Sequence, residues 1–519
     1  MVTIDEPAPK KLNVALVRPP IFFKRHGLAN EATPCLGLAY ISGYLKKYGY
    51  SPVFIDGIAE ALNKVWEPEM YPEFLCQGLT FDEVIRRIPN QTDVICVTAM
   101  FSGEWPFVRD LINQIREQFP DAVIIAGGEH ITALPDYCLK DCNGLDVCVL
   151  GEGEHKCYEI LEVISNEGAY GDIAGIGYLN EAGEYVQTST SLPRIRDIDS
   201  IPWPDWPEGY LEKFWAAGKS FGPQSARDMP MMFSRGCPYQ CTFCSNPNMW
   251  TTRYILRDID DVLAEVKSYI KDYNITAVQL YDLTAITKKR WIKEFLSELK
   301  RQDIKVQWDF PSGTRSEILD EETLSNLKDA GTNYLCFAPE SGSPNMLEKL
   351  KKRIDLNKMT DAMKIAKKLG LVVRANTIIG FPGEKRRDTM RTLFYGVKLS
   401  IMGVDELQPY IFMPYPGSEL FGKLAAEGKI DVNDDYFFSL SGLNSDLLSF
   451  SPLTFNEQMG PRELALYRLL FTMLTYGLSY LLYPSRIVRT VRNLISNEDA
   501  TTVFEHRLKD AFRRKKISP

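Results

Sequence analysis

The chain has 519 residues, 45% of them hydrophobic and 25% charged, which is the composition of a globular protein of roughly two to four domains. This composition excludes a disordered chain, a collagen-like chain and a small disulfide-stapled chain. With 60 Lys and Arg against 68 Asp and Glu, the net charge of −8 argues against a nucleic-acid-binding protein, and we expect no nucleic-acid partner.

The first part of the chain alternates short apolar runs with helical patterns. We expect helices near 36–48 and 104–118, and strands at 13–18, 52–55, 93–99, 121–126 and 145–150. This alternation predicts an α/β domain over residues 1–165, in which a Rossmann-like, doubly wound parallel sheet is covered by helices. Ligands of such sheets bind at the carboxyl ends of the strands. Those ends carry Pro20, Thr98, Ala99, Gly127, Gly128, Glu129, His130, Gly151 and Glu152.

A second alternation of strands and helices begins near residue 229, after a Pro- and Trp-rich connector over 166–228. We expect its strands at 230–234, 276–281, 305–310, 333–337, 372–379 and 405–412. Six βα units over 229–425 predict a partial (β/α)6 barrel of the TIM type. The remaining residues, 426–519, are expected to be mainly helical.

Three cysteines follow the first strand of this barrel. Cys237, Cys241 and Cys244 have C-x3-C-x2-C spacing on one short loop, so three thiolates could bind three irons of a [4Fe–4S] cluster and leave the fourth iron open. The alternatives are a zinc site or buried free thiols. Zinc usually needs a fourth protein ligand, and no further Cys or His is near in sequence.

This motif and the barrel resemble those of radical S-adenosylmethionine (SAM) enzymes, and the upstream domain resembles a cobalamin-binding domain. The resemblance to the cobalamin-dependent class B methyltransferase group covers about residues 12–425. It implies three cofactors: a [4Fe–4S] cluster, SAM and cobalamin. The Asp-x-His-x-x-Gly signature of histidine-ligated cobalamin is absent, so we expect no histidine below the cobalt. For His130, a role near the corrin and a polar role in its loop both stay open.

The resemblance also implies which residues contact SAM. Phe243 lies between the last two cysteines, Asp282 matches a position near the methionyl amine, and Arg315 could pair with the methionyl carboxylate or form a structural ion pair. Glu340 in APESGS matches a residue that contacts the ribose, although a strand-end carboxylate could instead pair with a Lys or Arg. In NTIIGFPGE, Ile378 and Gly380 match the segment that lies against the adenine.

Three aromatic residues occur at barrel strands, where they could line a substrate pocket or belong to the core: Tyr281, Trp308 and Tyr410. Cys336 also sits in a barrel strand, where a core position is favoured over a contact with substrate. No residue is named as a catalytic acid or base, and the chemistry expected from the cofactors does not require one.

The C-terminal region joins an apolar helix to a basic tail. Residues 463–482 are rich in Leu, Tyr and Phe, and residues 486–519 hold nine Lys and Arg against four Asp and Glu. A buried helix that caps the barrel and a contact with an anionic membrane surface both fit this pattern. The start of the chain has no signal-peptide pattern, so we expect a cytoplasmic protein, with membrane association left open.

The resemblance implies an enzyme that moves a methyl group from SAM, via methylcobalamin, to an unactivated carbon of a small molecule, with a lipid-like or terpenoid substrate among the candidates. It also implies an electron donor of the flavodoxin or ferredoxin type. The main alternative is an oxidative cyclase or a ring-rearranging enzyme of the same architecture. A non-catalytic cobalamin carrier would not need the cysteine motif.

Overall fold

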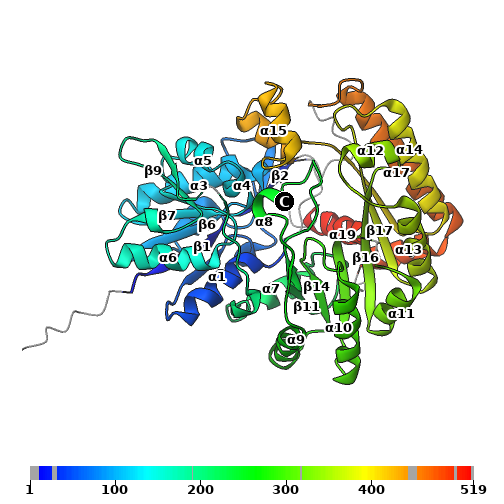
Figure 1. Cartoon of the computed structure of the whole chain (residues 1–519), viewed down its shortest axis with the longest axis horizontal. Helices are drawn as coiled ribbons and strands as arrows, with labels where there is room; N and C mark the ends of the chain where they lie inside the picture. The colour runs from blue at the N-terminus through cyan, green and yellow to red at the C-terminus, as the bar shows by residue number, and fades with distance from the viewer. Residues whose placement is uncertain are drawn as a thin grey trace, which may run out of the picture.

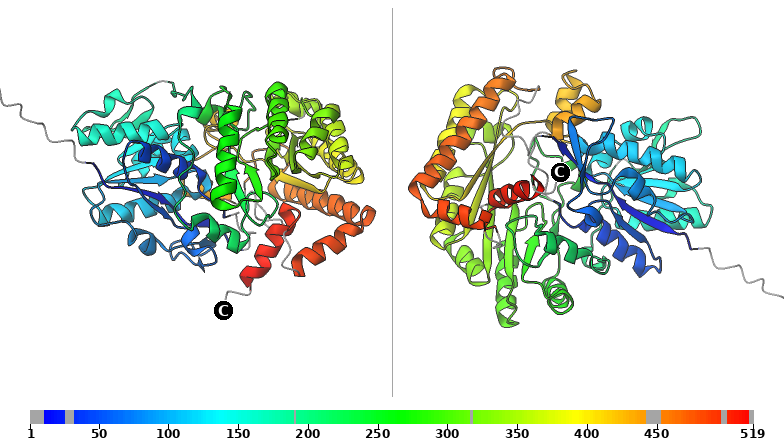
Figure 2. Two further views of the ribbon diagram at one scale, coloured as in Figure 1. Left: turned by 90° about the horizontal axis from the view of Figure 1, so that it is seen from below. Right: turned by 180° about the vertical axis from the view of Figure 1, so that it is seen from behind.

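The computed structural model describes residues 11–25, 32–189, 191–315, 318–441, 453–495 and 500–515. Two α/β units lie side by side, and the segment that carries α8 (Asn246–Trp250) lies between them (Figure 1). Two of the C-terminal helices, α17 (Pro461–Leu482) and α18 (Ser485–Ile495), lie on the side of the second unit away from the first (Figure 2), whereas α16 (Asp434–Ser441) packs on α3 (Trp105–Gln118) of the first unit. This arrangement confirms the α/β fold class and the helical C-terminal region.

The first unit contains a seven-stranded sheet in the order β10-β9-β8-β7-β6-β1-β3. Its five parallel strands confirm the five expected ones: β1 (Val14–Arg18), β3 (Val53–Asp56), β6 (Val94–Thr98), β7 (Val123–Gly127) and β8 (Val147–Val149). In chain order their arrangement is 2-1-3-4-5, so the sheet is doubly wound and its winding reverses between β1 and β6. The antiparallel β9 (Ile176–Leu179) and β10 (Tyr185–Gln187) extend this sheet into the range expected as a connector.

Both faces of this sheet are covered by helices, because successive strand residues point to opposite sides. Val14, Leu16 and Cys96 pack with α1 (Leu36–Lys47) and α6 (Glu154–Ser165). Ala15, Val17 and Ile95 pack with the helices of the other face, which are α2 (Phe81–Ile85), α3 (Trp105–Gln118), α4 (Glu129–Ala133) and α5 (Pro135–Asp141). The sequence did not predict the small antiparallel sheet of β2 (Ile21–Lys24), β4 (Val65–Trp66) and β5 (Phe74–Gln77).

The second unit is an open parallel barrel with strand order β11-β14-β15-β16-β17-β18. The strands are β11 (Asp228–Met231), β14 (Ala277–Leu280), β15 (Gln307–Thr314), β16 (Thr332–Glu340), β17 (Val372–Ile379) and β18 (Glu406–Ile411), all at expected places. The outer helices are α9 (Ile259–Tyr273), α10 (Lys289–Arg301), α11 (Glu321–Asp329), α12 (Pro344–Lys349), α13 (Leu356–Lys368) and α14 (Arg386–Ile401). The short ribbon of β12 (Ser234–Arg235) and β13 (Ile255–Leu256) brackets the cysteine loop, and α7 (Tyr210–Ala217) precedes the barrel.

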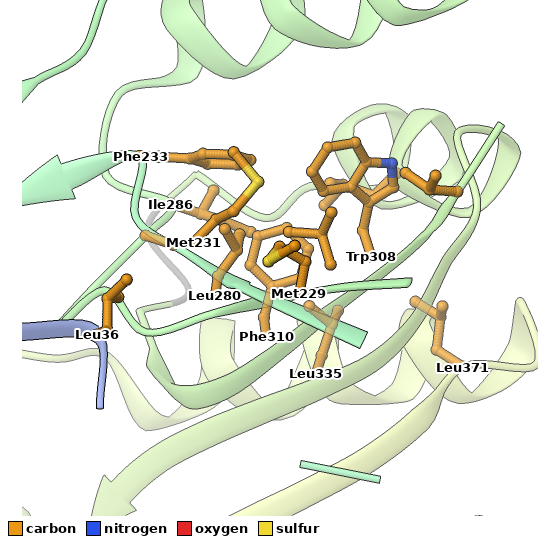
Figure 3. Close-up of a cluster of buried hydrophobic side chains, with 14 of the residues drawn as sticks. Leu36, Met229, Met231, Phe233, Leu280, Ile286, Trp308, Phe310, Leu335 and Leu371 are labelled. Carbon is orange, nitrogen blue, oxygen red and sulfur yellow. The ribbon is translucent and has the colours of Figure 1, made fainter. Parts of the chain in front are cut away.

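The largest hydrophobic core lies between the barrel strands and these helices. Met229, Met231, Leu280, Trp308 and Phe310 point into it together (Figure 3). Trp308 is therefore a core residue, which is the alternative that the sequence left open, and not part of a pocket. Because strand residues alternate, the polar residues next to these positions face the barrel interior.

The C-terminal region consists of α15 (Glu419–Ala426), α16 (Asp434–Ser441), α17 (Pro461–Leu482), α18 (Ser485–Ile495) and α19 (Val503–Lys515). The helix α17 packs along α14 and β18. The start of α19 packs against the barrel strands. Val503 joins Tyr334 and Cys336 in a small hydrophobic cluster, and the Phe504 amide donates a hydrogen bond to the Glu406 carboxylate at 2.6 Å. The last residues of the basic tail, 516–519, lie outside the described residues.

Candidate active site

The cysteine loop begins at a glycine that no other residue can replace without distortion. Gly236 has φ +90°, and a Cβ there would clash with the carbonyl oxygen of Arg253. Cys237, Cys241 and Cys244 follow as free, partly exposed thiols. Burial raises the pKa of each thiol, that of Cys244 to about 12, so cluster assembly must draw off their protons.

The donor set of this loop fits an iron–sulfur cluster better than a single metal ion. In the part of the chain that the structure describes, no three His, Cys, Asp or Glu side chains gather closely enough to hold one ion. A structural zinc site needs four ligands around one atom. Three thiolates that each bind a different iron need no such convergence.

Buried ion pairs fasten the cysteine loop to the first unit. The Arg235 guanidinium donates to Glu152 at 3.2 Å and to Glu154 at 2.6 Å, and Arg194 pairs with the other carboxylate oxygen of Glu152 at 2.8 Å. All four side chains are buried. Glu152 was expected to contact cobalamin, and here both its oxygens hold the loop and connector in place; a cobalamin contact stays a prediction.

A second contact joins the two units beside the last cysteine. The Ser245 hydroxyl donates a hydrogen bond to the Glu129 carboxylate, and burial raises the pKa of Glu129. Glu129 opens α4 at the end of β7, so the expected cobalamin edge of the first unit lies directly against the cysteine loop.

Asp282 holds the strand end that leads into the cysteine loop. Its carboxylate accepts hydrogen bonds from the Phe233 amide at 2.9 Å and from the Ser234 hydroxyl at 2.5 Å. The side chain is almost fully buried, and burial raises its pKa to about 6. The structure thus shows a positioning role for Asp282, and its contact with the methionyl amine stays a prediction.

Glu340 forms a buried ion pair with Lys352, which is the alternative to ribose contact that the sequence left open. It ends β16 with φ +61°, an uncommon backbone conformation for a residue with a side chain, and its carboxylate lies 2.7 Å from the Lys352 ammonium. Burial lowers the pKa of Lys352, but the charges of Glu340 and Cys241 raise it by more, so it stays a cation. A buried cation near Cys241 suits a loop whose cysteines would hold an anionic cluster.

Arg315 holds the segment that carries Lys352. Its guanidinium donates to the carbonyl oxygens of Lys352 at 3.0 Å and of Arg353 at 2.6 Å, and it stacks 3.4 Å above the ring of Tyr239 in the cysteine loop. Arg315 thereby ties β15 to both loops. Pairing with a methionyl carboxylate stays a prediction.

The turn after β17 is built around a buried carboxylate. Gly380 has φ +87°, and its amide and that of Phe381 donate to Glu384 at 2.7 and 3.0 Å. The Phe381 ring lies 5.7 Å from that of Phe243, so this turn contacts the cysteine loop. Ile378 lies two residues before Gly380, and its side chain packs in the same hydrophobic cluster as Phe381 and Phe243. These contacts place the expected adenine segment beside the cysteines.

The expected cobalamin edge is apolar and backbone-rich. Gly128 has φ +121°, and a Cβ there would lie 2.5 Å from the Ala99 carbonyl oxygen, so only glycine lets the ends of β7 and β6 press together. Next to Ala99, Met100 and Phe101 are 43% and 61% exposed. Open apolar side chains where the winding of the sheet reverses fit the broad face of a corrin ring. Pro20, Thr98, Gly127 and Gly151 lie at ends of the same parallel strands.

His130 is enclosed by aromatic rings. Trp105 and Phe437 lie 4.9 and 5.2 Å from its ring, Nδ1 is 2.9 Å from the Ser102 hydroxyl, and burial lowers its pKa to about 3. Nε2 is buried and has no hydrogen-bond partner among the described residues. Its buried position among aromatic rings fits a polar role within the loop, and a role near the corrin stays a prediction.

The barrel interior is polar below the expected SAM segment. The Tyr410 hydroxyl accepts a 2.8 Å hydrogen bond from Arg374, which also donates to Asn376 at 2.9 Å. The Asn376 amide is 3.4 Å from the Cys336 sulfur. Tyr281 packs on the Phe221 ring at 4.6 Å. Tyr410 and Cys336 are thus neighbours of the buried Arg374. The sequence pattern did not indicate this arginine.

Two family models match the chain. The B12 binding domain model matches residues 29–161, and the radical SAM superfamily model matches residues 231–395. The chain belongs to the cobalamin-dependent radical SAM enzymes. Cobalamin, SAM and a [4Fe–4S] cluster are accordingly its cofactors, as the sequence predicted.

Relatives of this radical SAM enzyme include two kinds of catalyst. It is 28% identical to a cytidylyl-2-hydroxyethylphosphonate methyltransferase of Streptomyces wedmorensis, over 82% of this chain and 84% of the relative. It is 27% identical to an anaerobic magnesium-protoporphyrin IX monomethyl ester cyclase of Rubrivivax gelatinosus, over 77% of this chain and 68% of the relative. Among solved structures, the radical SAM methyltransferase TsrM of Kitasatospora setae, with cobalamin and a [4Fe–4S] cluster bound, has a similar fold (TM-score 0.61, 16% identity, 80% of this chain and 78% of that one).

Proposed function

We propose that this enzyme transfers a methyl group from SAM, by way of cobalamin, to an unactivated carbon of a small molecule. The observation that carries the proposal is the direct contact between the two cofactor regions. Glu129 at the cobalamin edge accepts a hydrogen bond from Ser245, the residue after the last cysteine. A reaction that uses both cofactors on one substrate requires the two regions to face each other in this way.

The cofactors supply the reactive chemistry: the reduced cluster provides the electron that cleaves SAM, and cobalamin carries the methyl group. The chain binds and orients them. Cys237, Cys241 and Cys244 would hold the cluster, and Glu340 and Gly380 would hold the ribose and adenine of SAM. The edge at Ala99 and Gly128 would support the corrin.

The substrate group that enters the barrel should be polar. Arg374 is buried and bonded to amide and phenol oxygens rather than to a carboxylate. A buried guanidinium of this kind favours a substrate with an anionic or strongly polar group. A wholly apolar, terpenoid-like body would leave Arg374 and Asn376 facing hydrocarbon, so an amphiphilic substrate is the lipid-like form that suits this interior.

We further propose that the protein works in the cytoplasm with an electron donor of the flavodoxin or ferredoxin type. All eleven cysteines are free thiols, which suits a reducing compartment. The oxidative cyclase remains the second candidate, because three relatives carry that name and the domain architecture is shared.

The test is anaerobic reconstitution with iron, sulfide and hydroxocobalamin, followed by reduction in the presence of methyl-labelled SAM. Mass spectrometry should find 5′-deoxyadenosine, S-adenosylhomocysteine and labelled methyl on cobalamin. 5′-Deoxyadenosine without label on cobalamin, even with candidate substrates present, would favour the cyclase. The Cys244→Ala variant is the negative control and should form none of the products while still binding cobalamin.

A further inference from the structure

The packed helices α14, α17 and α18 each carry exposed apolar side chains, and we call these outer sides together the C-terminal face. On α17 it consists of Leu466, Leu470, Met473 and Leu481, spaced so that they share one side of the helix. Leu481 is 76% exposed. The opposite side of α17 buries three apolar residues, Leu464, Ala465 and Phe471, together with the polar Arg468, Thr475 and Ser479. A helix on the surface of a soluble protein usually turns polar residues outward, so this apolar outer side departs from the usual pattern.

In the next helix, α18, the usual pattern is reversed, with an apolar outer side and a polar buried side. Its exposed side carries Ile487, Val488, Val491 and Ile495, with Ile495 82% exposed. Its buried side carries Arg486 and Asn493. An apolar side that faces outward over two successive helices marks an interaction surface.

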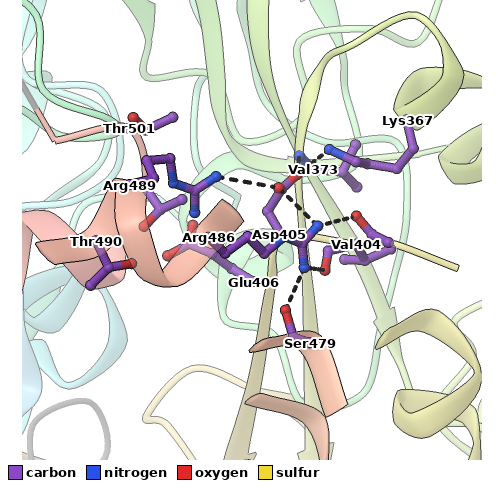
Figure 4. A network of polar contacts seen from close by, with 12 residues as sticks. Lys367, Val373, Val404, Asp405, Glu406, Ser479, Arg486, Arg489, Thr490 and Thr501 are labelled. Atoms are coloured by element: carbon purple, nitrogen blue, oxygen red, sulfur yellow. Dashed lines mark hydrogen bonds and ion pairs between the residues drawn. The ribbon is translucent and has the colours of Figure 1, made fainter. Parts of the chain in front are cut away.

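Polar bonds to the barrel hold α18 in this orientation (Figure 4). The Arg486 guanidinium donates to the Gly403 carbonyl at 2.6 Å, to the Val404 carbonyl at 3.0 Å and to Asp405 at 3.1 Å. It also donates to Ser479 of α17. Turning α18 over to hide its Ile and Val residues would break these bonds, so the apolar side is held outward by the fold itself.

Basic residues border the C-terminal face on α14. Phe394 and Ile401 are 63% and 54% exposed, and they alternate along the helix with exposed Arg387, Arg391 and Lys398. The helices α14 and α17 lie side by side, since the Ser400 hydroxyl donates to the Thr475 carbonyl at 2.5 Å. Figure 2 shows α17 and α18, in orange and red, on the side of the molecule away from the first unit.

We infer that the C-terminal face docks on an anionic lipid surface. Apolar side chains interleaved with Lys and Arg are the pattern of a helix at a membrane interface. The charges also argue against a second copy of the chain, because paired copies would bring Arg387 and Lys398 into a shared apolar interface with their own kind. Anionic headgroups would complement the same cations.

The geometry indicates contact with the surface rather than a membrane crossing. Among the described helices, α17 is the one long and apolar enough to span a bilayer, and 33% of its most apolar window is buried inside the fold. Phe471 packs closely against Gly396 of α14, and Leu464 lies against Gly380 of the turn after β17. Withdrawing α17 would dismantle the turn that is expected to hold adenine. This inference does not depend on which reaction the enzyme catalyses.

The test is co-sedimentation of the full chain with vesicles of phosphatidylcholine, alone or mixed with phosphatidylglycerol. We expect binding to the mixed vesicles, and at least about a tenfold loss in the Leu481→Glu/Val488→Glu variant, since each buried aliphatic side chain contributes on the order of 1.5–3 kcal/mol. Arg387→Gln/Lys398→Gln should abolish the preference for mixed vesicles. Met70→Glu, which changes a 72% exposed methionine of the first unit, is the matched control and should bind like wild type.

Unchanged cobalamin and cluster content, with an unchanged circular dichroism spectrum, would show that the variants fold. Wild-type protein that ignores both kinds of vesicle would overturn the inference. So would a dimer in sedimentation velocity that Leu481→Glu/Val488→Glu dissociates, without any vesicle binding, because the face would then bind a second copy. Equal loss in Met70→Glu would show that the effect is not specific to this face.

Discussion

The two regions expected to hold the cofactors are lined by different kinds of residue. The edge of the first sheet offers backbone, glycine and open apolar side chains, as at Ala99, Gly128 and Phe101. The barrel mouth offers buried charge, as in the Glu340–Lys352 pair. On the function proposed above, the corrin would be held at the sheet edge by shape, whereas SAM and the cluster would be held at the barrel mouth by charge. Substitutions should therefore act through steric fit on one side and through charge on the other.

The largest expected effect is on the shape-based side. Gly128→Ala places a Cβ 2.5 Å from the Ala99 carbonyl oxygen at φ +121°, so the ends of β6 and β7 must separate. We expect loss of cobalamin binding, measured by absorbance after gel filtration of reconstituted protein, with cluster absorption retained. Gly171→Ala is the control, since a Cβ there meets no atom within 4 Å. Normal cobalamin content in Gly128→Ala would place the corrin elsewhere.

The next effect is on the charge-based side. Glu340→Gln leaves the buried Lys352 ammonium without its carboxylate, which should lower the free energy of unfolding by about 3–5 kcal/mol. Glu340→Gln/Lys352→Met should recover most of that stability, because no buried charge remains unpaired. SAM binding, measured by equilibrium dialysis, should be lost in both variants. Restored SAM binding in the double variant would reduce Glu340 to a structural partner of Lys352.

The fold was predictable because it depends on local patterns. Each of the eleven parallel strands of the two sheets overlaps a strand expected from the alternation of strand and helix patterns in the sequence. The β2-β4-β5 sheet was missed because its strands have two to four residues and pair across a long separation. The strands β9 and β10 were hidden in a range without long periodicity, and they are stabilised by joining a sheet that already exists.

The site was predictable where chemistry imposes a spacing, as for the three cysteines, and less so where it depends on packing. Lys352 and Arg235 look like ordinary basic residues in the sequence. Their importance arises from carboxylates that the fold brings to them, 83 positions away in the case of Arg235 and Glu152. For Trp308 the sequence left pocket and core open, since an aromatic residue on a barrel strand can face the helices as readily as the interior, and the fold places it in the core.

The smallest expected effect concerns a buried carboxylate inside the barrel, and it tests whether a negative charge is tolerated there. Asp309 is buried on β15, where Gln307 donates to one carboxylate oxygen at 2.8 Å and the other has no hydrogen-bond partner among the described residues. Burial raises its pKa from 3.8 to about 7. Between these values the folded chain keeps a proton that the unfolded chain releases. The free energy of unfolding therefore falls as pH rises, by up to about 1.4 kcal/mol per pH unit, and the loss is complete above pH 7.

The Asp309→Asn variant has no titrating proton at this position. The difference between its melting temperature and that of wild type should therefore shift in favour of the variant as the pH is raised from 5 to 8. Asp303→Asn is the control, because Asp303 is 78% exposed in the turn before the same strand and should track wild type throughout. Parallel melting curves for Asp309→Asn and wild type across this range would mean that Asp309 is ionised in the fold. The barrel interior would then hold a buried anion at β15, where Gln307 is its hydrogen-bond donor, and buried charge would not be confined to the Glu340–Lys352 region.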